Sequence, residues 1–322
     1  MKITQSRFAV TAMMFAIFTL LATGLANAQT QPVKCSSQIT ACGCTITAPG
    51  SYTIENTLDY SQGLTLKNGC IDITASNIDL YAYQYIQGPG ADSTCSSDTP
   101  KKNRDVGIHV LPSASNVSIY VDDYYACGWN YGVESEGSNI NWYEVGSYYN
   151  NVGMYLNNAT DNNCLSCYFS NSVGSGVQIV GGSGNNFNDS QAYLNGQYGF
   201  WVDGSSENTF NSDYGYDGNV LAGFYLGCNA KGNVNPMILC PKNTPTTHNS
   251  LLVNYAYTYY PSYGYLPQKY GIAVEKGSIY NTFNENDTFG NTKKDIIDGN
   301  GNCIYNTYQN DTYTTKSPNC VQ

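Results

Sequence analysis

Short stretches in which apolar and polar residues alternate recur along the chain, and each begins with a glycine. The segment GVQIVGGSGNNFNDSQAYLNGQYGFWV, residues 176–202, opens with Gly-Val-Gln-Ile-Val and returns to Gly-Phe-Trp-Val. Alternation with a period of two indicates strands, and no segment after residue 107 has the spacing of a helix. The phrase begins at these residues: Gly107, Gly132, Gly153, Gly176, Gly199, Gly223 and Gly271.

Most of these glycines are 21 to 25 residues apart, and a fixed period predicts a repeat architecture. Each period holds three short strand-like pieces, with Gly, Asn, Ser and Asp at corners where left-handed backbone is tolerated. Three strands and three corners make one triangular coil of a parallel β-helix, stacked on the next coil at ~4.8 Å. The 48-residue step from Gly223 to Gly271 is interpreted as one coil with insertions. The residues expected to face inward are Val177, Ile179, Phe187, Phe200, Val202, Phe210, Phe224, Ile272 and Phe283.

The chain is expected to consist of four parts. Residues 1–28 contain Lys2, Arg7, an apolar run and Ala26-Asn27-Ala28, the pattern of a secretory signal peptide, so we expect a secreted protein without a membrane span. Residues 29–63 differ from the repeat and are expected to form an atypical N-terminal cap. Residues 64–313 are expected to form an all-β solenoid, a right-handed parallel β-helix of about nine to ten coils. Residues 314–322 form a C-terminal tail.

Several segments resemble a known family. SENTFNSDYGYDGN, GSIYNTFNENDTFGN and CGCTITAPGSYTIENTLDY resemble right-handed parallel β-helices of the pectate-lyase-like superfamily, in particular the NosD-like repeat group. The resemblance covers roughly Thr40 to Tyr313 and implies the fold, whereas this architecture hosts lyases, hydrolases, epimerases, adhesins and inert scaffolds. Galacturonan hydrolases of this fold carry Asp-Asp, Gly-His-Gly and Arg-Ile-Lys elements. Only the first has a match here, at Asp122-Asp123.

Net charge restricts the partners. Without Lys2 and Arg7, which lie in the signal segment, 12 basic residues face 24 acidic ones, a net charge of −12. Arg104 is the only remaining arginine. A nucleic-acid-binding surface and a pocket for a polyanionic sugar both need clustered Lys and Arg. We therefore expect no nucleic-acid partner, and a neutral rather than an acidic glycan.

The cysteines indicate disulfides. All 12 lie after the expected cleavage position, and an even number in an exported protein is typical of paired cysteines. Cys164-Leu-Ser-Cys167 is compatible with a redox pair or half of a zinc site. A structural role is favoured, because a zinc site would need further ligands that are scarce here. The expected pairs are Cys228–Cys240, which closes a loop, Cys303–Cys320, which holds the tail, Cys42 or Cys44 with Cys70, and Cys95–Cys127.

A set of acidic residues precedes successive repeat glycines by nine or ten positions, and stacking of coils is expected to bring them to one edge. Paired carboxylates are the groups that glycoside hydrolysis needs. With Asn carbonyls they also suit calcium, the one cofactor considered, at Asp189 and Asp213. The favoured interpretation is a corner ladder whose side chains bond neighbouring backbone. The candidate catalytic residues are Asp122, Asp123, Glu144, Asp189 and Asp213.

Tyrosine is abundant, with 30 residues in the chain, and is densest in the segment YAYTYYPSYGYLPQKY. A tyrosine ring stacks on the apolar face of a sugar while its hydroxyl forms hydrogen bonds. The alternative is that these residues line strands, where aromatic side chains are favoured. The candidate ligand-binding residues are Tyr255, Tyr257, Tyr259, Tyr260, Tyr263 and Tyr265.

Three functions follow from these features. The favoured one is a non-catalytic scaffold or binding protein of the cell surface or extracellular matrix that engages neutral glycans through Tyr-rich loops. One alternative is a polysaccharide-processing enzyme, a hydrolase or lyase, that uses the acidic row. The other is a self-assembling structural protein that associates through its C-terminal coil if the tail leaves that edge uncovered. Cys320 is expected to fold the tail back across it.

Overall fold

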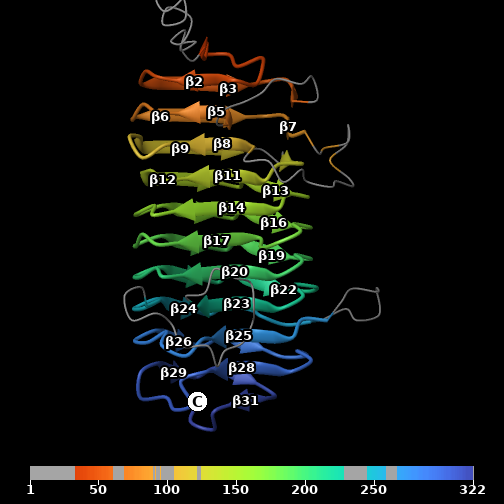
Figure 1. The fold of residues 1–322 in the computed structure, drawn as a ribbon, viewed down its shortest axis with the longest axis vertical. Coiled ribbons are helices and arrows are strands. Elements are labelled where there is room, and N and C mark those ends of the chain that lie inside the picture. Colours follow the sequence, from red (N-terminus) through yellow and green to blue (C-terminus); the bar gives the residue numbers. More distant parts are fainter. Residues whose placement is uncertain are drawn as a thin grey trace, which may run out of the picture. The chain divides into compact units, whose positions relative to one another are not determined.

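The described strands are parallel and pass in a repeating order through three sheets (Figure 1). The structure is a computed structural model that describes residues 33–60, 69–89, 91, 95, 105–121, 125–227, 245–258 and 267–321. The chain divides into Met1–Val33 and Lys34–Gln322, and the second unit holds the solenoid. The signal-peptide prediction for residues 1–28 lies outside the described residues. Within the described ranges, no helix is long and apolar enough to cross a membrane.

Each coil contributes one strand to each sheet in turn. Sheet A has 12 strands: β1 Val33–Lys34, β2 Cys44–Ile46, β5 Gly69–Ile73, β8 Val106–Val110, β11 Tyr131–Ser135, β14 Val152–Asn157, β17 Val177–Val180, β20 Tyr198–Asp203, β23 Ala222–Gly227, β25 Tyr270–Val274, β28 Lys294–Asp298 and β31 Lys316–Ser317. Sheet B has 10 strands: β3 Gly50–Ile54, β6 Ile78–Ala82, β9 Ser115–Val121, β12 Ser138–Tyr143, β15 Asn163–Leu165, β18 Asn186–Asn188, β21 Thr209–Asn211, β24 Ser250–Leu252, β26 Thr282–Asn284 and β29 Thr307–Gln309.

Sheet C is narrower and is interrupted near the C-terminal end. Its seven-stranded part contains β4 Leu58–Asp59, β7 Ile86–Gln87, β10 Tyr125–Cys127, β13 Gly146–Tyr148, β16 Tyr168–Ser170, β19 Gln191–Tyr193 and β22 Tyr214–Tyr216. A two-stranded part contains β27 Asp287–Thr288 and β30 Thr312–Tyr313. Tyr255 forms single bridges to Tyr214 and Asp287 and so joins the two parts. The expected all-β parallel β-helix is thereby confirmed, with about nine turns.

The interior is a stack of apolar side chains repeated from coil to coil. All nine residues expected to face inward are at most 1% exposed. Phe200 and Phe224 stack with ring centroids 4.9 Å apart, and Phe187 and Phe210 with centroids 5.4 Å apart. Every coil therefore buries its inner face against its neighbours, as a repeat of this length requires.

Buried asparagines explain why Asn recurs at one corner of the coil. In six successive coils the side-chain Nδ2 of one Asn donates to Oδ1 of the next, at 2.8 to 3.2 Å. The same Oδ1 also accepts the backbone N–H of the preceding Asn, so one carboxamide satisfies two donors. Such pairing removes the cost of burying polar groups at a corner. The ladder consists of Asn162, Asn185, Asn208, Asn249, Asn281 and Asn306.

The structure differs from the expected segments at residues 29–63 and agrees with them at the 48-residue step. Residues 29–63 were expected to be a cap, but β2, β3 and β4 already pair in parallel with β5, β6 and β7. This segment therefore contains a full coil. The coil was not predicted from the sequence, because the segment lacks the repeated phrase that begins with Gly. The interpretation of the 48-residue step is correct, because β24 pairs with both β21 and β26 as the sheet B strand of that coil.

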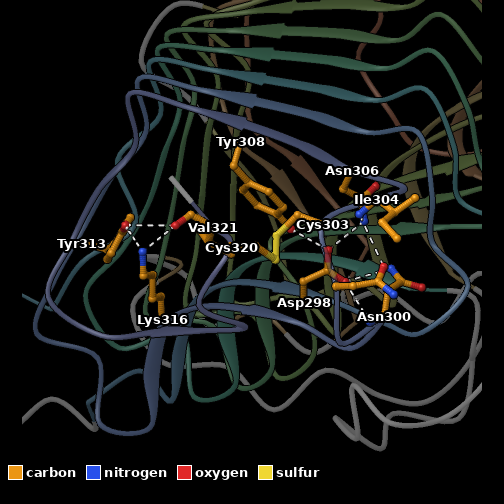
Figure 2. Close-up of a disulfide and its surroundings, with 11 residues drawn as sticks. Asp298, Asn300, Cys303, Ile304, Asn306, Tyr308, Tyr313, Lys316, Cys320 and Val321 are labelled. Atoms are coloured by element: carbon orange, nitrogen blue, oxygen red, sulfur yellow. Dashed lines mark hydrogen bonds between the residues drawn. A yellow bond between two sulfur atoms is a disulfide. The ribbon is translucent and has the colours of Figure 1, made fainter.

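The C-terminal tail returns across the end of the solenoid (Figure 2). Cys303 and Cys320 form a disulfide, and β31 pairs with β28 of sheet A. The side chain of Val321 is fully buried in the core. Lys316 Nζ donates to the main-chain oxygen of Val321 at 2.6 Å, which fixes the last described residue. The expected cover over this end is therefore present.

The described residues hold five disulfides, which indicate an oxidising compartment. The expected pairs Cys42–Cys70, Cys95–Cys127 and Cys303–Cys320 are confirmed. Cys164 pairs with Cys167, which agrees with a structural role. Cys44 pairs with Cys35, a partner that spacing did not indicate. The Cys228–Cys240 prediction lies outside the described residues.

Candidate functional site

The described members of the predicted acidic row fall at two different positions of the coil. Register places Tyr143 beside Leu165, and Leu165 beside Asn188. Glu144 and Asp189 therefore occupy the same corner position two coils apart, both exposed and both with left-handed backbone, φ 55° and 53°. Two coil repeats separate their Cα atoms by roughly 9.6 Å. Asp122 and Asp123 lie outside the described residues.

Asp213 occupies a different position from Asp189. Asn188 pairs with Asn211, so the residue equivalent to Asp189 is Ser212, and Asp213 lies one residue further along the coil. Asp189 and Asp213 both lie ten residues before the next repeat glycine, so the count from that glycine does not show the one-residue difference. The segment between β22 and β23 is one residue longer than the segment between β19 and β20, because β22 follows β19 by 23 residues and β23 follows β20 by 24.

Asp213 belongs to a second buried ladder. Its Oδ1 accepts the backbone N–H of Ser190 at 2.7 Å, and its own N–H donates to Oδ1 of Asn254 at 2.9 Å. Burial raises the pKa of Asp213 well above its ordinary value, although the bonds from Ser190 and Asn211 oppose the shift. The side chain is fully buried and is committed to the backbone. It therefore fits the corner-ladder interpretation rather than catalysis.

Calcium at Asp189 and Asp213 stays a prediction. The two carboxylates lie at non-equivalent positions, one exposed and one buried. Across the described part of the chain, no group of three or more His, Cys, Asp or Glu side chains is arranged to hold a metal ion.

The described members of the predicted tyrosine loop belong to the coil itself. Tyr255 stacks on Tyr214 with centroids 4.8 Å apart, and Tyr257 stacks on Phe289 at 4.7 Å. Both rings are half-buried and continue stacks that run from coil to coil. The strand-lining alternative therefore describes Tyr255 and Tyr257. The other four candidates, Tyr259, Tyr260, Tyr263 and Tyr265, lie outside the described residues.

An open pocket of about 320 Å³ lies on the outer side of sheet B, where β9 and β12 end. Tyr120 and Tyr143 alternate with the buried Ile119 and Trp142, so both rings point outward. They stack with centroids 4.7 Å apart and planes 5° apart, and Tyr81 continues the stack beyond Tyr120 at 4.9 Å. The pocket is lined by Tyr83, Tyr120, Val121, Tyr143 and Glu144.

This pocket, the tyrosine pocket, combines the two kinds of group that recognise sugars. Tyr83 is 42% exposed and supplies an aromatic surface beside the stacked rings. Glu144 supplies carboxylate oxygens that accept hydrogen bonds from hydroxyl groups. Among the described lining residues, the carboxylate of Glu144 is the only formal charge. The arrangement suits a ligand that is neutral and rich in hydroxyl groups.

Glu144 was among the candidates expected from the sequence, whereas Tyr83, Tyr120 and Tyr143 were not. The signal for the stacked rings is a phrase repeated at the same place in three coils: Asn-Ile-Asp-Leu-Tyr ending at Tyr81, Asn-Val-Ser-Ile-Tyr ending at Tyr120, and Asn-Ile-Asn-Trp-Tyr ending at Tyr143. Equivalent residues of adjacent coils lie ~4.8 Å apart, the distance at which aromatic rings stack. The phrase therefore predicts the stack.

A second group of charged residues lies on the outer face of sheet A. His109 Nδ1 is 3.4 Å from Asp72 Oδ1, and His109 Nε2 is 3.5 Å from Glu136 Oε2. Asn157 Nδ2 donates to the other oxygen of Glu136 at 2.8 Å. Burial lowers the pKa of His109, but Asp72, Glu134 and Glu136 together raise it above its ordinary value. Both ring nitrogens face carboxylates, so the group is a brace across coils.

Further along the same face, two carboxyl groups are buried beside aromatic rings. Asp203 of β20 pairs with Gly227, which in turn lies beside Glu275 in the following coil. Burial, and then the negative charge of Glu275, raises the pKa of Asp203 to about 6. Tyr198, Trp201 and Tyr225 pack beside the pair. Asp203 and Glu275 are both buried, so a polysaccharide cannot reach their carboxyl groups. We therefore assign this cluster a role in stability rather than in binding.

Comparison with known proteins supports the fold. No family model matches the chain, and no curated protein matches it. It is similar to the crystal structure of pectate lyase Pel9A, with 14% identity over 86% of this chain and 70% of that chain and a TM-score of 0.54.

A second solved structure gives the same result. The chain is similar to DFA-IIIase from Arthrobacter chlorophenolicus A6 without its lid, with 12% identity over 75% of this chain and 66% of that chain and a TM-score of 0.50. At such identities the likeness shows the fold and leaves activity open. The chain therefore has the right-handed parallel β-helix fold of the pectate-lyase-like proteins.

Proposed function

We propose that the protein binds a neutral polysaccharide at the tyrosine pocket, without a chemical step. The observation that carries the proposal is the pocket itself, which is open to solvent and lined by three tyrosines and Glu144. Aromatic surface and a hydrogen-bond acceptor together recognise the alternating apolar and hydroxyl-bearing surfaces of a sugar ring.

Charge supports a neutral ligand. An acidic glycan would place its carboxylates near Glu144, in a protein with 12 basic and 24 acidic residues after the signal segment. Like charges without an intervening cation repel. A neutral glucan, galactan or xylan avoids this cost. We therefore expect the protein to discriminate against polygalacturonate, although its fold is shared with a pectate lyase.

The enzyme alternative rested on several carboxylates in one row. Of the described candidates only Glu144 lines the pocket, and hydrolysis requires two carboxyl groups at a defined separation. Asp122 and Asp123 follow Val121 directly in sequence and lie outside the described residues, so this alternative stays a prediction. A reducing-end assay on each polysaccharide that binds tests this alternative. If the wild type produces new reducing ends and Glu144→Gln does not, the protein is an enzyme rather than a binding protein.

The direct experiment is affinity electrophoresis of the purified mature protein in gels that contain neutral polysaccharides, with polygalacturonate as the acidic comparison. Retardation in at least one neutral gel, lost in Tyr143→Ala, supports the proposal. Equal mobility of wild type and Tyr143→Ala in every gel opposes it.

A further inference from the structure

One corner of the coil, between sheets A and B, has left-handed backbone in coil after coil. Bridges between adjacent coils align the equivalent residues, for example Thr160 with Ser183 and Thr247 with Ile279. The residue that follows each of these positions has φ between 54° and 71°. We call this set the first-corner column: Asn77, Asn116, Asn139, Asp161, Gly184, Glu207, His248 and Tyr280.

The column changes character near the C-terminal end. Its earlier members are Asn, Asp, Gly and Glu, and the first three of these types suit left-handed backbone. Tyr280 has φ 61°, in a conformation that bulky side chains adopt rarely and at a free-energy cost. Tyr149, Leu194 and Val253 have the same left-handed backbone at other corners, where their side chains are half-buried. What distinguishes Tyr280 is the exposure of its ring.

The aromatic side chains at this corner are turned to solvent. Tyr280 is 54% exposed, and Tyr305 and Ile304 of the next coil are 44% and 79% exposed. The rings of His248 and Tyr280 stack with centroids 5.4 Å apart, and Tyr305 meets Tyr280 edge-on at 6.5 Å. These three rings form the corner aromatic row. Because Tyr280 and Tyr305 stay exposed, the fold gains little burial from them.

We propose that the corner aromatic row is a second contact surface for the neutral polysaccharide bound at the tyrosine pocket, a step that rests on the proposed function. Exposed tyrosine rings pack against the apolar faces of sugar rings, and successive coils present them along a line. Glu207, the preceding member of the column, is acidic, so an anionic chain is disfavoured here as at the pocket.

The shape of the row favours a polysaccharide over a protein partner. A stable protein interface buries roughly 800 Å² on each side. Among the described residues of this corner, the exposed large apolar side chains are Tyr280, Ile304 and Tyr305. A linear polymer matches a narrow row, whereas a folded partner needs a broad patch. Between β12 at the pocket and β26 after Tyr280 lie five coil steps, about 24 Å along the stack, so only a long chain reaches both surfaces.

The test uses a substitution that separates binding from folding. Tyr280→Asn installs the residue that this corner carries in three earlier coils, so its melting temperature should equal or exceed that of the wild type. Its affinity for the long neutral polysaccharide should fall three- to tenfold, and further in Tyr280→Asn/Tyr305→Asn. Affinity for a short oligosaccharide of the same sugar, which occupies the pocket alone, should stay unchanged. Asp161→Asn, in the same column, is the matched control and should bind as the wild type does.

Three other outcomes would contradict the proposal. If the affinity for the polymer is unchanged in the double variant while Tyr143→Ala loses binding, the corner aromatic row is not a binding surface. The proposed binding at the tyrosine pocket is then unaffected. A lower melting temperature for Tyr280→Asn shows that the ring is structural and also overturns the row. A wild-type protein that binds no neutral polysaccharide removes both proposals together.

Discussion

Ser190 and Asp213 are joined across adjacent coils, because the backbone N–H of Ser190 donates to Oδ1 of Asp213 at 2.7 Å. Asn254 and Asn286 continue the same ladder, where Asn254 Nδ2 donates to Oδ1 of Asn286 at 3.0 Å. Asp213 thus takes the place of an asparagine. Its second oxygen, Oδ2, is buried without a hydrogen bond among the described residues.

The first prediction concerns this ladder position. In Asp213→Asn the new N–H₂ group replaces the unpaired Oδ2 and can donate as Asn254 Nδ2 does to the carbonyl of Phe210, at 3.0 Å. We expect the free energy of unfolding at pH 7 to stay unchanged or rise. Asp213→Ala leaves the Ser190 N–H unpaired and should lose about 1–3 kcal/mol. Urea denaturation measures both, and a large loss in Asp213→Asn would show that the negative charge is required.

The second prediction concerns the brace at His109. Its pKa is raised in the folded state by Asp72, Glu134 and Glu136 despite burial, so its stabilisation is complete below the unfolded pKa of about 6.5. That stabilisation is lost as pH rises through the folded pKa. The wild type should exceed His109→Gln in stability by about 1 kcal/mol at pH 5.5, with a smaller difference at pH 9. A difference independent of pH would show that His109 acts through packing alone.

The third prediction concerns the buried pair Asp203 and Glu275. Burial and then Glu275 raise the pKa of Asp203 to about 6, so the stabilisation is complete below the unfolded value of about 3.8 and is lost as pH rises through about 6. Between pH 4.5 and pH 7.5 the free energy of unfolding should fall, with about 2 kcal/mol from this residue, because part of the loss already occurs below pH 4.5. In Asp203→Asn the fall should be smaller by that amount. An unchanged pH profile in the variant would argue against the pair as its source.

The fourth prediction concerns the C-terminal tail. Truncation after Thr314 removes β31, the buried Val321 and the Cys303–Cys320 disulfide, which alone is typically worth about 2–4 kcal/mol. It also leaves the edge of β28 without its partner, and uncovered edges recruit strands. We expect a lower melting temperature and self-association of the truncated chain, with a monomeric full-length protein. Size-exclusion chromatography with light scattering measures both, and two equally monomeric, equally stable proteins would contradict the expected role of the tail.

The repeat predicted the fold because each coil obeys the same physical rule. An apolar residue after each glycine and alternate residues beyond it must face inward, so Val177, Phe200 and Phe224 are placed correctly by period alone. Register around the corner is different. One additional residue between Tyr216 and Ala222 shifts the count, and Asp213 then appears equivalent to Asp189 when it is not.

Pairing across coils was the other limit. The stack of Tyr120 on Tyr143 was present in the sequence as a repeated phrase, yet its meaning depends on the register of two strands. The contact of His109 with Glu136 also joins residues of different coils, 27 positions apart. Such contacts become predictable only when the coil length is known residue by residue.

The final prediction tests the central claim, the binding of a neutral polysaccharide at the tyrosine pocket. Tyr143→Ala removes a pocket ring, and Glu144→Gln keeps the shape while removing the charge. Tyr193→Ala removes a ring of comparable packing outside the pocket, stacked on Tyr216 with centroids 5.4 Å apart. It therefore controls for loss of an outer aromatic stack, and circular dichroism should show that all three variants keep the β-helix.

The most direct measurement is the dissociation constant of each protein for a neutral oligosaccharide, determined by isothermal titration calorimetry. The oligosaccharide is prepared from a neutral polysaccharide that retards the wild type in the gels. We predict at least tenfold weaker binding for Tyr143→Ala, since loss of one stacked sugar contact costs about 1.4 kcal/mol or more. Weaker binding by a smaller factor is expected for Glu144→Gln, and wild-type affinity for Tyr193→Ala. Equal affinities of the wild type and Tyr143→Ala, or tighter binding to polygalacturonate than to any neutral polysaccharide, would contradict the proposed function.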